Sequence, residues 1–566
     1  MLIFLWVVPI GAQEQAKRAW ITVLSTTDLH GNILPVDYYT NKPDARGLAK
    51  VATLVRQARK ENPHTLLVDS GDTIQGTPFA YYHNKKNNQP PDPMMLAMSA
   101  LGFDALAVGN HEYNFGLKVL EKARGEANFP WLSANTYRQG TRETYHRPYL
   151  VKELGGVRVG VLGLTTPGVP FWENKENYVG LEFREPVAEA RKWVKELREK
   201  EKVDLLVVAM HMGLEEDLRT GERGPGQVRQ ENAALEIART VPGIDLILLG
   251  HTHREVPALL VADQRERQQI TFGSGSSQIS GTFFSSPSDS VLLTQANFWG
   301  RHLARADVYL ERDGQEGRWR VVAKSARTIP VTDQTPVDPE IARLAEPYDR
   351  ETQAWLGQVI GHSAKELTAA EARFRDTAIL DLIQRVQLDV SRADVSMAAV
   401  FNPQARLPAG DVTVRDISGL YIYENTLVVI EVTGRQLKDA LEHSAKYFRA
   451  YVPGKSAADL VDDKIPGYNF DIAEGVSYDL DLTKPVGQRI QNLSFRGQLL
   501  APEQKLKLAT NNYRVNGGGG YDMYKGAPVL YRSSEEIREL IIDWVERHKL
   551  VPTAPTDNWR LVLPEK

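Results

Sequence analysis

The chain has 566 residues, which is longer than the chains that usually fold around a single hydrophobic core, so we expect at least two domains. Its 68 basic and 72 acidic side chains leave a net charge of -4, which argues against polymeric nucleic acid as a partner. The absence of cysteine excludes disulfides, thiolate metal sites and cysteine nucleophiles, so any metal must be held by histidine, carboxylate and amide side chains.

The first residues, MLIFLWVVPIGAQ, form a short apolar run that ends in small residues, and the polar EQAKRAW follows. This order resembles the hydrophobic and cleavage regions of a secretory signal, although the usual basic start is missing. We therefore expect residues 1–18 to be a signal or N-terminal anchor, and the protein to be exported to the periplasm or cell surface. The run is too short to span a bilayer, and no other segment predicts a transmembrane helix.

Residues 19–330 alternate short apolar runs with charged amphipathic stretches. The apolar runs, each ending in a polar loop, lie at residues 19–28, 64–72, 103–110, 157–166, 203–211 and 244–253. Between them, residues 47–61 and 185–202 carry apolar side chains at helical spacing. This alternation predicts a layered α/β domain whose sheet is covered on both faces and whose reactive groups gather at strand ends.

Residues 331–358 are expected to link this domain to a second one. A polar, proline-containing stretch comes first, and the amphipathic pattern of residues 339–360 predicts one helix. Residues 359–566 form the predicted second domain. Helices are expected there at residues 378–391 and 434–445, strands at 427–434 and 506–513, and a glycine run at 517–520.

Seven side chains with metal-binding groups follow the predicted strands of the first domain, in the motifs TTDLHG, SGD, GNH, AMH and GHTH. A pair of divalent cations needs several N and O ligands, with one carboxylate shared to offset their repulsion. Asp-x-His and His-x-His can each direct two side chains to one point, because alternate residues of an extended segment point the same way. The sequence therefore predicts a two-metal site with the ligands Asp28, His30, Asp72, Asn110, His211, His251 and His253.

These motifs resemble those of the calcineurin-like metallophosphoesterases, and the layout of nearly the whole chain resembles their 5′-nucleotidase branch. The resemblance implies an α/β (α+β) fold: a four-layer metallophosphoesterase-type β-sandwich flanked by helices, followed by a C-terminal α/β domain that binds substrate. It implies two divalent ions, zinc, manganese, cobalt or iron. One ion would be held by Asp28, His30, Asp72 and His253, and the other by Asp72, Asn110, His211 and His251, so that Asp72 bridges them.

His111 adjoins one of these ligands. The resemblance implies that it faces the phosphate and assists the leaving oxygen. Relatives that cleave 5′-nucleotides carry an Asp three residues later, which orients this ring, whereas this chain has Asn114. An amide can hold the imidazole by a hydrogen bond but cannot offset an imidazolium charge. We predict His111 and Asn114 as the catalytic pair, and the Asn disfavours a strict 5′-nucleotidase.

The second domain carries FNPQARLPAGD, YIYEN, YNFDIAEGVSYDLD and NNYRVNGGGGYD, which look closest to the 2′,3′-cyclic-nucleotide 2′-phosphodiesterase/3′-nucleotidase subfamily. The resemblance implies that two tyrosines stack on the base, which tolerates any base; core packing is the alternative. A glycine stands where 5′-nucleotide relatives have an Asp that a cyclic phosphate would repel. The predicted substrate-binding residues are Asn402, Arg406, Tyr423, Tyr513 and Gly519.

The predicted function is metal-dependent hydrolysis of nucleoside 2′,3′-cyclic phosphates to 3′-nucleotides, and of 3′-nucleotides to nucleoside and phosphate. Two alternatives stay open: a 5′-nucleotidase or nucleotide-sugar hydrolase with the same site, and a non-catalytic nucleotide-binding surface protein. We expect a monomer whose partner is the nucleotide substrate. The histidines without ligand spacing are interpreted as surface or structural residues: His64, His83, His146, His302, His362, His443 and His548.

Overall fold

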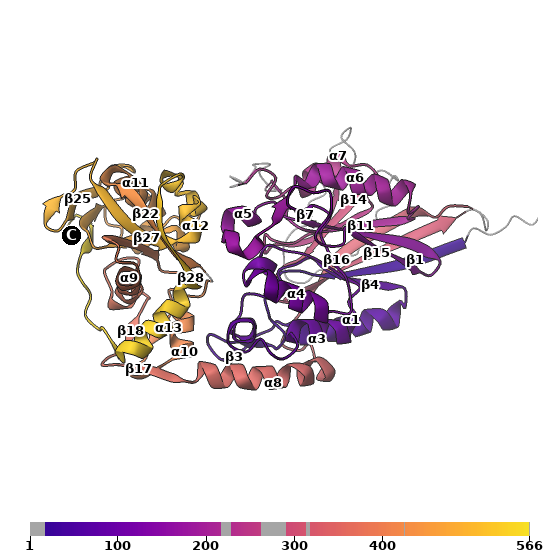
Figure 1. Ribbon diagram of the computed structural model, residues 1–566, viewed down its shortest axis with the longest axis horizontal. Coiled ribbons are helices and arrows are strands. Elements are labelled where there is room, and N and C mark those ends of the chain that lie inside the picture. Colours follow the sequence, from indigo (N-terminus) through magenta and orange to yellow (C-terminus); the bar gives the residue numbers. More distant parts are fainter. Residues whose placement is uncertain (1–16, 217–227, 262–289, 313–316, 424, 565–566) are drawn as a thin grey trace, which may run out of the picture.

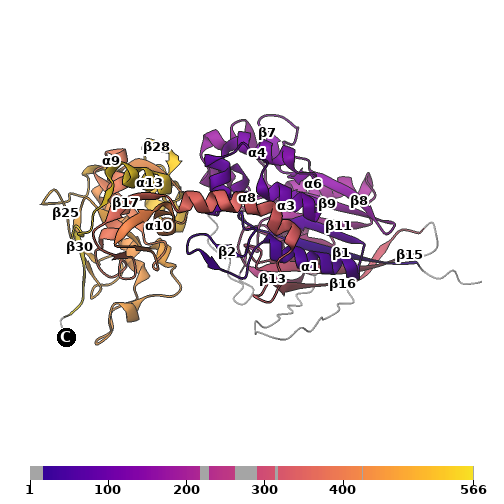
Figure 2. The same ribbon diagram turned by 90° about the horizontal axis from the view of Figure 1, so that it is seen from below.

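The structure is a computed structural model that describes residues 17–216, 228–261, 290–312, 317–423 and 425–564. The predicted signal or anchor lies outside these residues except for its last two positions, since the first described strand, β1, begins at Lys17. Within the described ranges, none of the helices combines the length and the apolar character needed to cross a membrane. The chain folds into an N-terminal unit and a C-terminal unit, which α8 (Pro339–Leu356) joins (Figures 1 and 2).

Two six-stranded sheets form the N-terminal unit (Figure 1). In each sheet four neighbouring strands run parallel, and antiparallel strands complete one edge of the first sheet and both edges of the second. The first sheet has the order β16 (Arg320–Pro330), β15 (His302–Arg312), β1 (Lys17–Thr26), β4 (Thr65–Asp69), β5 (Ala105–Ala107) and β6 (Trp131–Leu132). The second has the order β13 (Glu255–Val261), β14 (Val291–Ala296), β12 (Leu246–Leu248), β11 (Leu205–His211), β9 (Val157–Thr165) and β8 (Tyr149–Leu154).

Successive side chains of these strands face two different layers, as the period of a β-strand requires. Val68 and Val207 lie in the core between the two sheets. Their neighbours Leu67 and Val208 face outward, toward α1 (Leu48–Glu61) and α3 (Pro93–Leu101) on one side and α6 (Pro186–Glu199) and α7 (Ala234–Thr240) on the other. The order helix, sheet, sheet, helix confirms the predicted four-layer fold class.

The loops of the N-terminal unit contain short elements that surround the candidate site. On the side of the first sheet these are β2 (Val36–Asp37), β3 (Lys42–Pro43), α2 (Pro78–Tyr81), η1 (Tyr82–Lys86), η2 (His111–Tyr113) and α4 (Gly116–Glu126). On the side of the second sheet they are β7 (Thr136–Arg138), α5 (Val169–Trp172), η3 (Lys175–Tyr178) and β10 (Leu181–Phe183).

The C-terminal unit contains a five-stranded sheet with α9 (Ala378–Ser391), α10 (Val414–Leu420), α11 (Gly434–Ser444) and α13 (Ile537–His548) around it (Figure 1). Its strand order is β23 (Asp471–Glu474), β19 (Val395–Ala399), β27 (Lys505–Asn511), β22 (Thr426–Thr433) and β28 (Val529–Glu536), and α12 (Asn512–Val515) follows β27. Smaller sheets are formed by β17 (Val359–Ser363) with β21 (Gly410–Thr413) and β29 (Leu550–Val551), by β18 (Leu367–Thr368) with β20 (Arg406–Leu407), and by β24 (Ser477–Asp481), β25 (Ile490–Phe495), β26 (Gln498–Leu499) and β30 (Trp559–Val562).

The predicted connector helix is shorter than its apolar pattern suggested. The pattern continued to residue 360, but α8 ends at Leu356, with Gly357 as its C-terminal cap. The next residues form β17, which pairs with β21, so their backbone groups are satisfied by a sheet instead of a helix. The helix expected at residues 378–391 is confirmed as α9.

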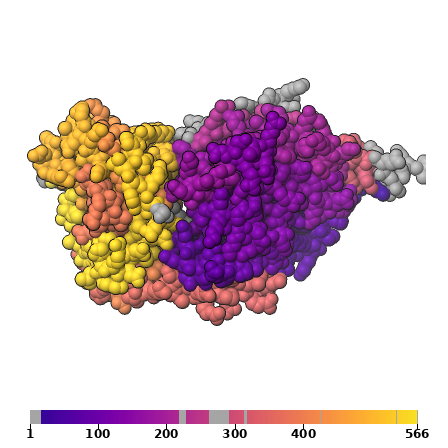
Figure 3. All heavy atoms as spheres, viewed as in Figure 1, coloured from indigo at the N-terminus to yellow at the C-terminus, as the bar shows by residue number. Residues whose placement is uncertain are grey.

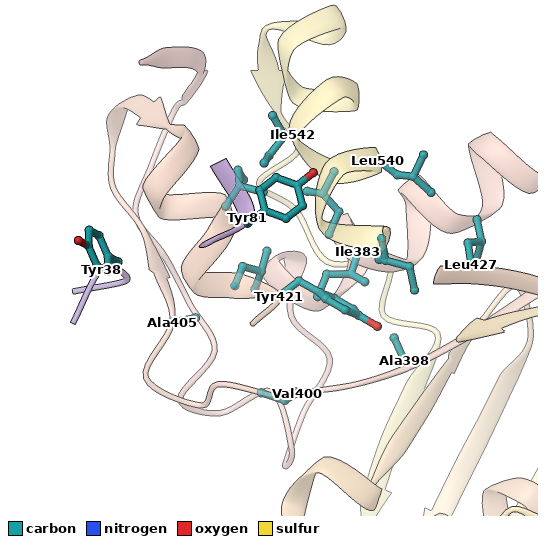
Figure 4. Packing of buried hydrophobic residues seen from close by; sticks show 14 of the residues in the cluster. Tyr38, Tyr81, Ile383, Ala398, Val400, Ala405, Tyr421, Leu427, Leu540 and Ile542 are labelled. Carbon is teal, nitrogen blue, oxygen red and sulfur yellow. The ribbon is translucent and has the colours of Figure 1, made fainter. Parts of the chain in front are cut away.

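The two units share one hydrophobic cluster beside α8, and Figure 3 shows them in contact. Tyr81 of the N-terminal unit stacks on Trp355 of α8, with ring centroids 5.9 Å apart, and the Arg538 guanidinium lies 4.8 Å from the Tyr81 ring. Figure 4 shows Tyr81 among Leu540 and Ile542 of the C-terminal unit. This packing fixes the C-terminal unit against the N-terminal one.

Asp338 should contribute measurably to the stability of α8. Its Oδ1 accepts hydrogen bonds from the backbone N–H groups of Glu340 and Ile341 at 3.1 Å, and its Oδ2 pairs with Arg56 Nε at 2.5 Å. Asp338→Ala removes this cap, so we expect a loss of about 1 kcal/mol and a lower midpoint of thermal unfolding. Asp338→Asn keeps a good cap and should lose less. Equal melting of both variants would show that the cap is not the source of the stability.

Candidate metal centre

The predicted ligands converge at the carboxyl ends of the parallel strands of both sheets. Asp28 follows β1, Asp72 follows β4 and Asn110 follows β5, whereas His211 is the last residue of β11. The pair His251 and His253 follows β12. Since these strand ends lie at the same edge of the sandwich, side chains that are distant in sequence meet there.

The residues of the Asp-x-His and His-x-His motifs do not lie in extended segments, contrary to the reasoning that linked these motifs to strand geometry. Strand β1 ends at Thr26 and β12 ends at Leu248, before the motifs begin. Five ligands instead have left-handed backbone conformations, which non-glycine residues rarely adopt and which concentrate at functional sites. Their φ angles are 50° at Asp28, 48° at His30, 59° at Asp72, 71° at His251 and 52° at His253.

Two groups of potential ligands lie side by side. One group is Asp28, His30 and His253, and the other is Asp72, His211 and His251, with the ligand atoms of each group within 4.8 Å of one another. Asp72 Oδ2 lies 2.9 Å from His211 Nε2 in its own group and 3.9 Å from His30 Nε2 in the other. Asp72 therefore stands between the groups, where the predicted bridging carboxylate is needed.

Several buried polar atoms fit a pair of divalent ions. Asn110 Oδ1 is buried and accepts no hydrogen bond from the described residues, so it is available as a ligand. His30 Nε2 and His253 Nε2 lie 3.0 Å apart, a distance at which two imidazole nitrogens need a proton or a cation between them. Oxygen and imidazole ligands of this kind suit zinc, manganese, cobalt and iron.

Backbone carbonyls orient two of the histidines. His211 Nδ1 donates to the carbonyl of Ser70 at 2.7 Å, and His30 Nδ1 donates to the carbonyl of Gln75 at 2.9 Å. A proton held on Nδ1 leaves Nε2 without one, which is the form that binds a metal ion. Both rings thus direct Nε2, the nitrogen that can bind a metal ion, toward the centre.

Glu112 is a residue that the sequence reasoning missed. Its Oε2 accepts from the backbone N–H groups of Asp72 at 2.9 Å and Gly109 at 2.7 Å, and its Oε1 accepts from that of Thr73 at 2.5 Å. This buried carboxylate therefore holds the loop that carries Asp72. Its only sequence signal is its place next to His111 in GNHEYN.

The electrostatics of the centre favour a positive charge. Burial alone would lower the pKa of His211, but the carboxylates of Asp72 and Asp28 help to raise it to about 10. Burial and the neighbouring His253 lower the pKa of His30 to about 4. Burial would raise the pKa of Asp72, yet His211 and His111 hold it well below its usual range. Divalent ions would supply the positive charge that a proton on His211 otherwise provides.

His111 and Asn114, the predicted catalytic pair, are in direct contact. His111 Nδ1 donates to Asn114 Oδ1 at 2.6 Å. His111 Nε2 lies 4.0 Å from Asp72 Oδ2, and the side chain is 37% exposed, so the ring borders the centre on its open side. The backbone N–H of His111 donates to Asp72 Oδ1 at 2.9 Å. The pair is therefore linked to the carboxylate of Asp72.

An aromatic group in the C-terminal unit contains both predicted stacking residues. Tyr423 is 41% exposed and lies edge-on to Phe401, with ring centroids 5.1 Å apart. Burial raises the pKa of Tyr423, and the nearby phenols of Tyr468 and Tyr513 raise it further. Tyr468 is 40% exposed and was not singled out in the sequence, because a single tyrosine in a loop has no distinctive pattern.

Asn402 and Arg406 have partners within the C-terminal unit. Asn402 Nδ2 donates to the carbonyl of Gly419 at 2.9 Å, and its Oδ1 accepts from the backbone N–H of Gln404 at 3.0 Å. Arg406 is exposed and pairs with Glu366 at 3.0 Å. These contacts hold their own loops, and a substrate role for either residue stays a prediction.

Gly519 lies in a crowded turn with a φ of 72°. A Cβ atom at this position would lie 2.4 Å from Arg514 Nη1 and 2.4 Å from Asn469 Oδ1. Any side chain here would also adopt a left-handed backbone conformation, which disfavours L residues. The turn is therefore built for glycine, and an aspartate could occupy it only if Arg514 and Asn469 moved.

Comparisons with known proteins agree with this geometry. Residues 21–255 match the family model for calcineurin-like phosphoesterases, and residues 359–526 match that for the 5′-nucleotidase C-terminal domain. A 2′,3′-cyclic-nucleotide 2′-phosphodiesterase/3′-nucleotidase of Yersinia enterocolitica is 30% identical over 97% of this chain and 89% of its own length. The trifunctional nucleotide phosphoesterase YfkN of Bacillus subtilis is 28% identical over 98% of this chain, which spans 40% of that protein.

A solved structure has the same overall fold. The crystal structure of a putative 5′-nucleotidase from Staphylococcus aureus, in complex with alpha-ketoglutarate, aligns with a TM-score of 0.76 and 28% sequence identity. The alignment covers 96% of this chain and all of that one. These comparisons confirm the resemblance seen in the sequence motifs.

The geometry predicts that the chain binds two divalent ions. Metal analysis of purified protein should give about two ions per chain, since the two ligand groups resemble the centres of two-metal enzymes. His251→Ala should lower the content toward one ion, and Asp72→Ala should lower both, because Asp72 faces both groups. His362→Ala, at an exposed site in the C-terminal unit, serves as the control. A His251→Ala variant with the full metal content would contradict the assignment.

Proposed function

The chain belongs to the calcineurin-like phosphoesterases that carry a 5′-nucleotidase C-terminal domain, and we propose that it hydrolyses nucleoside 2′,3′-cyclic phosphates to 3′-nucleotides and these to nucleoside and phosphate. As a member of this family it is a metallophosphoesterase. The observation that carries the proposal is the pairing of His111 with Asn114, instead of Asp, beside the two ligand groups. Relatives named for this activity are 29% to 30% identical over nearly the whole chain.

The side chains present can perform this chemistry once metal is bound. Two divalent ions in the ligand groups would supply an activated water and hold the phosphate oxygens. His111 lies beside the bridging carboxylate with Nε2 toward the centre, where it can give a proton to a leaving oxygen. Ring opening breaks the bond from phosphorus to the 2′ oxygen, and the second step breaks that to the 3′ oxygen. Both leaving groups are alkoxides, so one proton donor serves both steps.

The C-terminal unit would bind the nucleoside. Tyr423 and Tyr513 present aromatic faces, and stacking on such faces does not depend on the identity of the base. Figure 1 shows α12 facing α5, and Asn512, next to Tyr513, donates to the carbonyl of Trp172. The Trp172 ring packs on His251 of the candidate centre. The base and the phosphate would therefore be held by different units.

One alternative keeps the same centre. The similarity to a putative 5′-nucleotidase structure makes 5′-nucleotides the second candidate substrates. A catalytically inactive nucleotide-binding protein is a weaker candidate, because the ligand groups and His111 are all in place. Export and a monomeric state stay proposals; the apolar run at residues 1–13 motivates the first.

A comparison of three substrates tests the proposed function. We expect kcat/KM for 2′,3′-cyclic AMP and 3′-AMP to exceed that for 5′-AMP by about tenfold or more, which corresponds to about 1.4 kcal/mol in the transition state. The reason is that Asn114 and Gly519 replace the carboxylates that favour 5′-nucleotides. The assay measures phosphate and nucleoside release with added metal. Faster hydrolysis of 5′-AMP would instead establish the 5′-nucleotidase, and no release from any of them would favour the inactive protein.

Tyr423 should contribute to nucleotide binding by stacking. Tyr423→Ala removes the ring and should raise KM for 3′-AMP and 3′-CMP alike. The rise corresponds to a loss of about 1–3 kcal/mol of binding free energy. Tyr423→Phe keeps the ring face and should stay close to the wild type. Hydrolysis of p-nitrophenyl phosphate, which has no base, should change little. If Tyr423→Ala leaves KM for both nucleotides unchanged, the tyrosine does not bind the base.

A further inference from the structure

The segment Phe171–Glu173 lies where the metal centre, the catalytic pair and the C-terminal unit meet. It forms the end of α5 and the residue after it. The Trp172 ring packs on the ligand His251, with ring centroids 5.3 Å apart. Glu173 reaches Asn114 of the catalytic pair. No motif in the sequence points to this segment, and neither step of the proposed hydrolysis involves it directly.

The carboxylate of Glu173 accepts three hydrogen bonds. Asn114 Nδ2 donates to Oε2 at 2.6 Å. The backbone N–H of Asn174 donates to Oε1 at 2.7 Å, and Asn177 Nδ2 donates to the same oxygen at 3.0 Å. Burial raises the pKa of Glu173, and these three donors oppose the rise. Both oxygens therefore act as acceptors for N–H donors.

These contacts fix which way the Asn114 amide points. An asparagine side chain has nearly the same shape when its amide is turned by half a revolution, so its neighbours decide which end faces which partner. A carboxylate can only accept, so Nδ2 of Asn114 must face Glu173 and Oδ1 must face His111. The short contact at 2.6 Å then requires Nδ1 of His111 to donate, and this bond is kept when a second proton occupies Nε2. His111 Nε2 faces the centre, and the proton that it gives to the leaving oxygen comes from the ring protonated on both nitrogens.

We propose that Glu173 is a positioning residue, which acts through Asn114 to fix the orientation of the His111 ring and to keep an acceptor opposite its Nδ1–H. The inference rests on the proposed function, because it assumes that His111 assists the leaving oxygen. Glu173 supplies, one side chain further away, the carboxylate that 5′-nucleotide relatives place at the position of Asn114. The neutral amide of Asn114 lies between Glu173 and His111 and orients the imidazole without carrying a charge.

The C-terminal unit holds the same segment. Asn512 Oδ1 accepts from the backbone N–H of Thr426 at 3.0 Å, so its Nδ2 is directed outward and donates to the carbonyl of Trp172 at 2.9 Å. Asn516 Nδ2 donates to the carbonyl of Phe171. Both asparagines flank Tyr513 on or next to α12, which faces α5 in Figure 1. The two carbonyls that precede Glu173 are therefore bound by the unit that stacks on the base.

Glu173→Gln is the sharpest single variant, because glutamine has the same shape but one of its two terminal atoms is a donor. If the glutamine oxygen keeps the hydrogen bonds from Asn174 and Asn177, its amide nitrogen faces Asn114. The Asn114 amide must then turn and present Nδ2 to His111. We expect kcat for 3′-AMP to fall by about 10- to 100-fold, with KM little changed. The rate with p-nitrophenyl phosphate should fall far less, because a phenolate leaves without a proton.

Three variants calibrate this result. His111→Ala should show the same dependence on the leaving group, and more strongly. Glu176→Gln changes an exposed carboxylate in the same loop and should match the wild type with both substrates. The double variant Asn114→Asp with Glu173→Gln exchanges donor and acceptor, since the introduced glutamine can donate to the introduced aspartate while that aspartate accepts from His111. This exchange should restore most of the activity on 3′-AMP.

The outcomes separate a positioning role from a structural one. Equal losses with 3′-AMP and p-nitrophenyl phosphate, wild-type rates for Glu173→Gln, or a double variant with no recovery would each overturn the proposal. If the single variant does not fold, the double variant decides through the ratio of its rates with 3′-AMP and p-nitrophenyl phosphate. A wild-type ratio supports the positioning role of Glu173, and the ratio of His111→Ala contradicts it. If the wild type hydrolyses 5′-AMP and neither of the other nucleotides, the proposed function fails, and the same variants test Glu173 on 5′-AMP.

Discussion

The burial of two carboxylates is the constraint on which the rest of the candidate site depends. Asp28 and Asp72 are almost fully removed from solvent, at 0% and 1% exposure, and an isolated charge in such a place costs several kcal/mol. The loops after the strands take up left-handed conformations, which bring imidazoles around these carboxylates. Glu112 binds the backbone of the Asp72 loop, so that loop cannot move to relieve the charge. A cation pair is the simplest way to neutralise such a centre.

The layers of the sandwich place this centre, and α8 places the second unit over it. The parallel strands of both sheets end at one edge, so ligands from β1, β4, β5, β11 and β12 reach the same region. The stacking of Tyr81 on Trp355 and the pairing of Lys86 with Glu539 at 3.1 Å hold the C-terminal unit near that edge. The C-terminal unit also contacts the segment beside the centre, since Asn512 donates to the carbonyl of Trp172, whose ring packs on His251.

The sequence predicted the layers and identified side chains that the structure brings together, because both depend on local patterns. Each ligand follows a short apolar run, and such runs identify buried strands whatever their partners. The backbone conformation of the ligand motifs and the contacts between distant residues could not be predicted from the sequence. Extended geometry at Asp28 and His30 was a wrong expectation, since the chain turns before the motif. Glu173 lies 59 residues after Asn114, and only the folded chain shows that they touch. Glu112 and Tyr468 were missed for the same reason: their roles come from contacts and not from spacing.

The relay from Glu173 to His111 also separates two tasks that an aspartate would combine. A carboxylate in contact with the imidazole both orients it and places a negative charge close to the phosphate. Coulomb repulsion falls with distance, so moving a unit charge from about 4 Å to about 8 Å halves its interaction with an anionic substrate. Asn114 keeps the hydrogen bond to His111 while Glu173 keeps the charge behind the amide. A site arranged in this way orients its proton donor with less electrostatic cost to binding a phosphate that is already negatively charged.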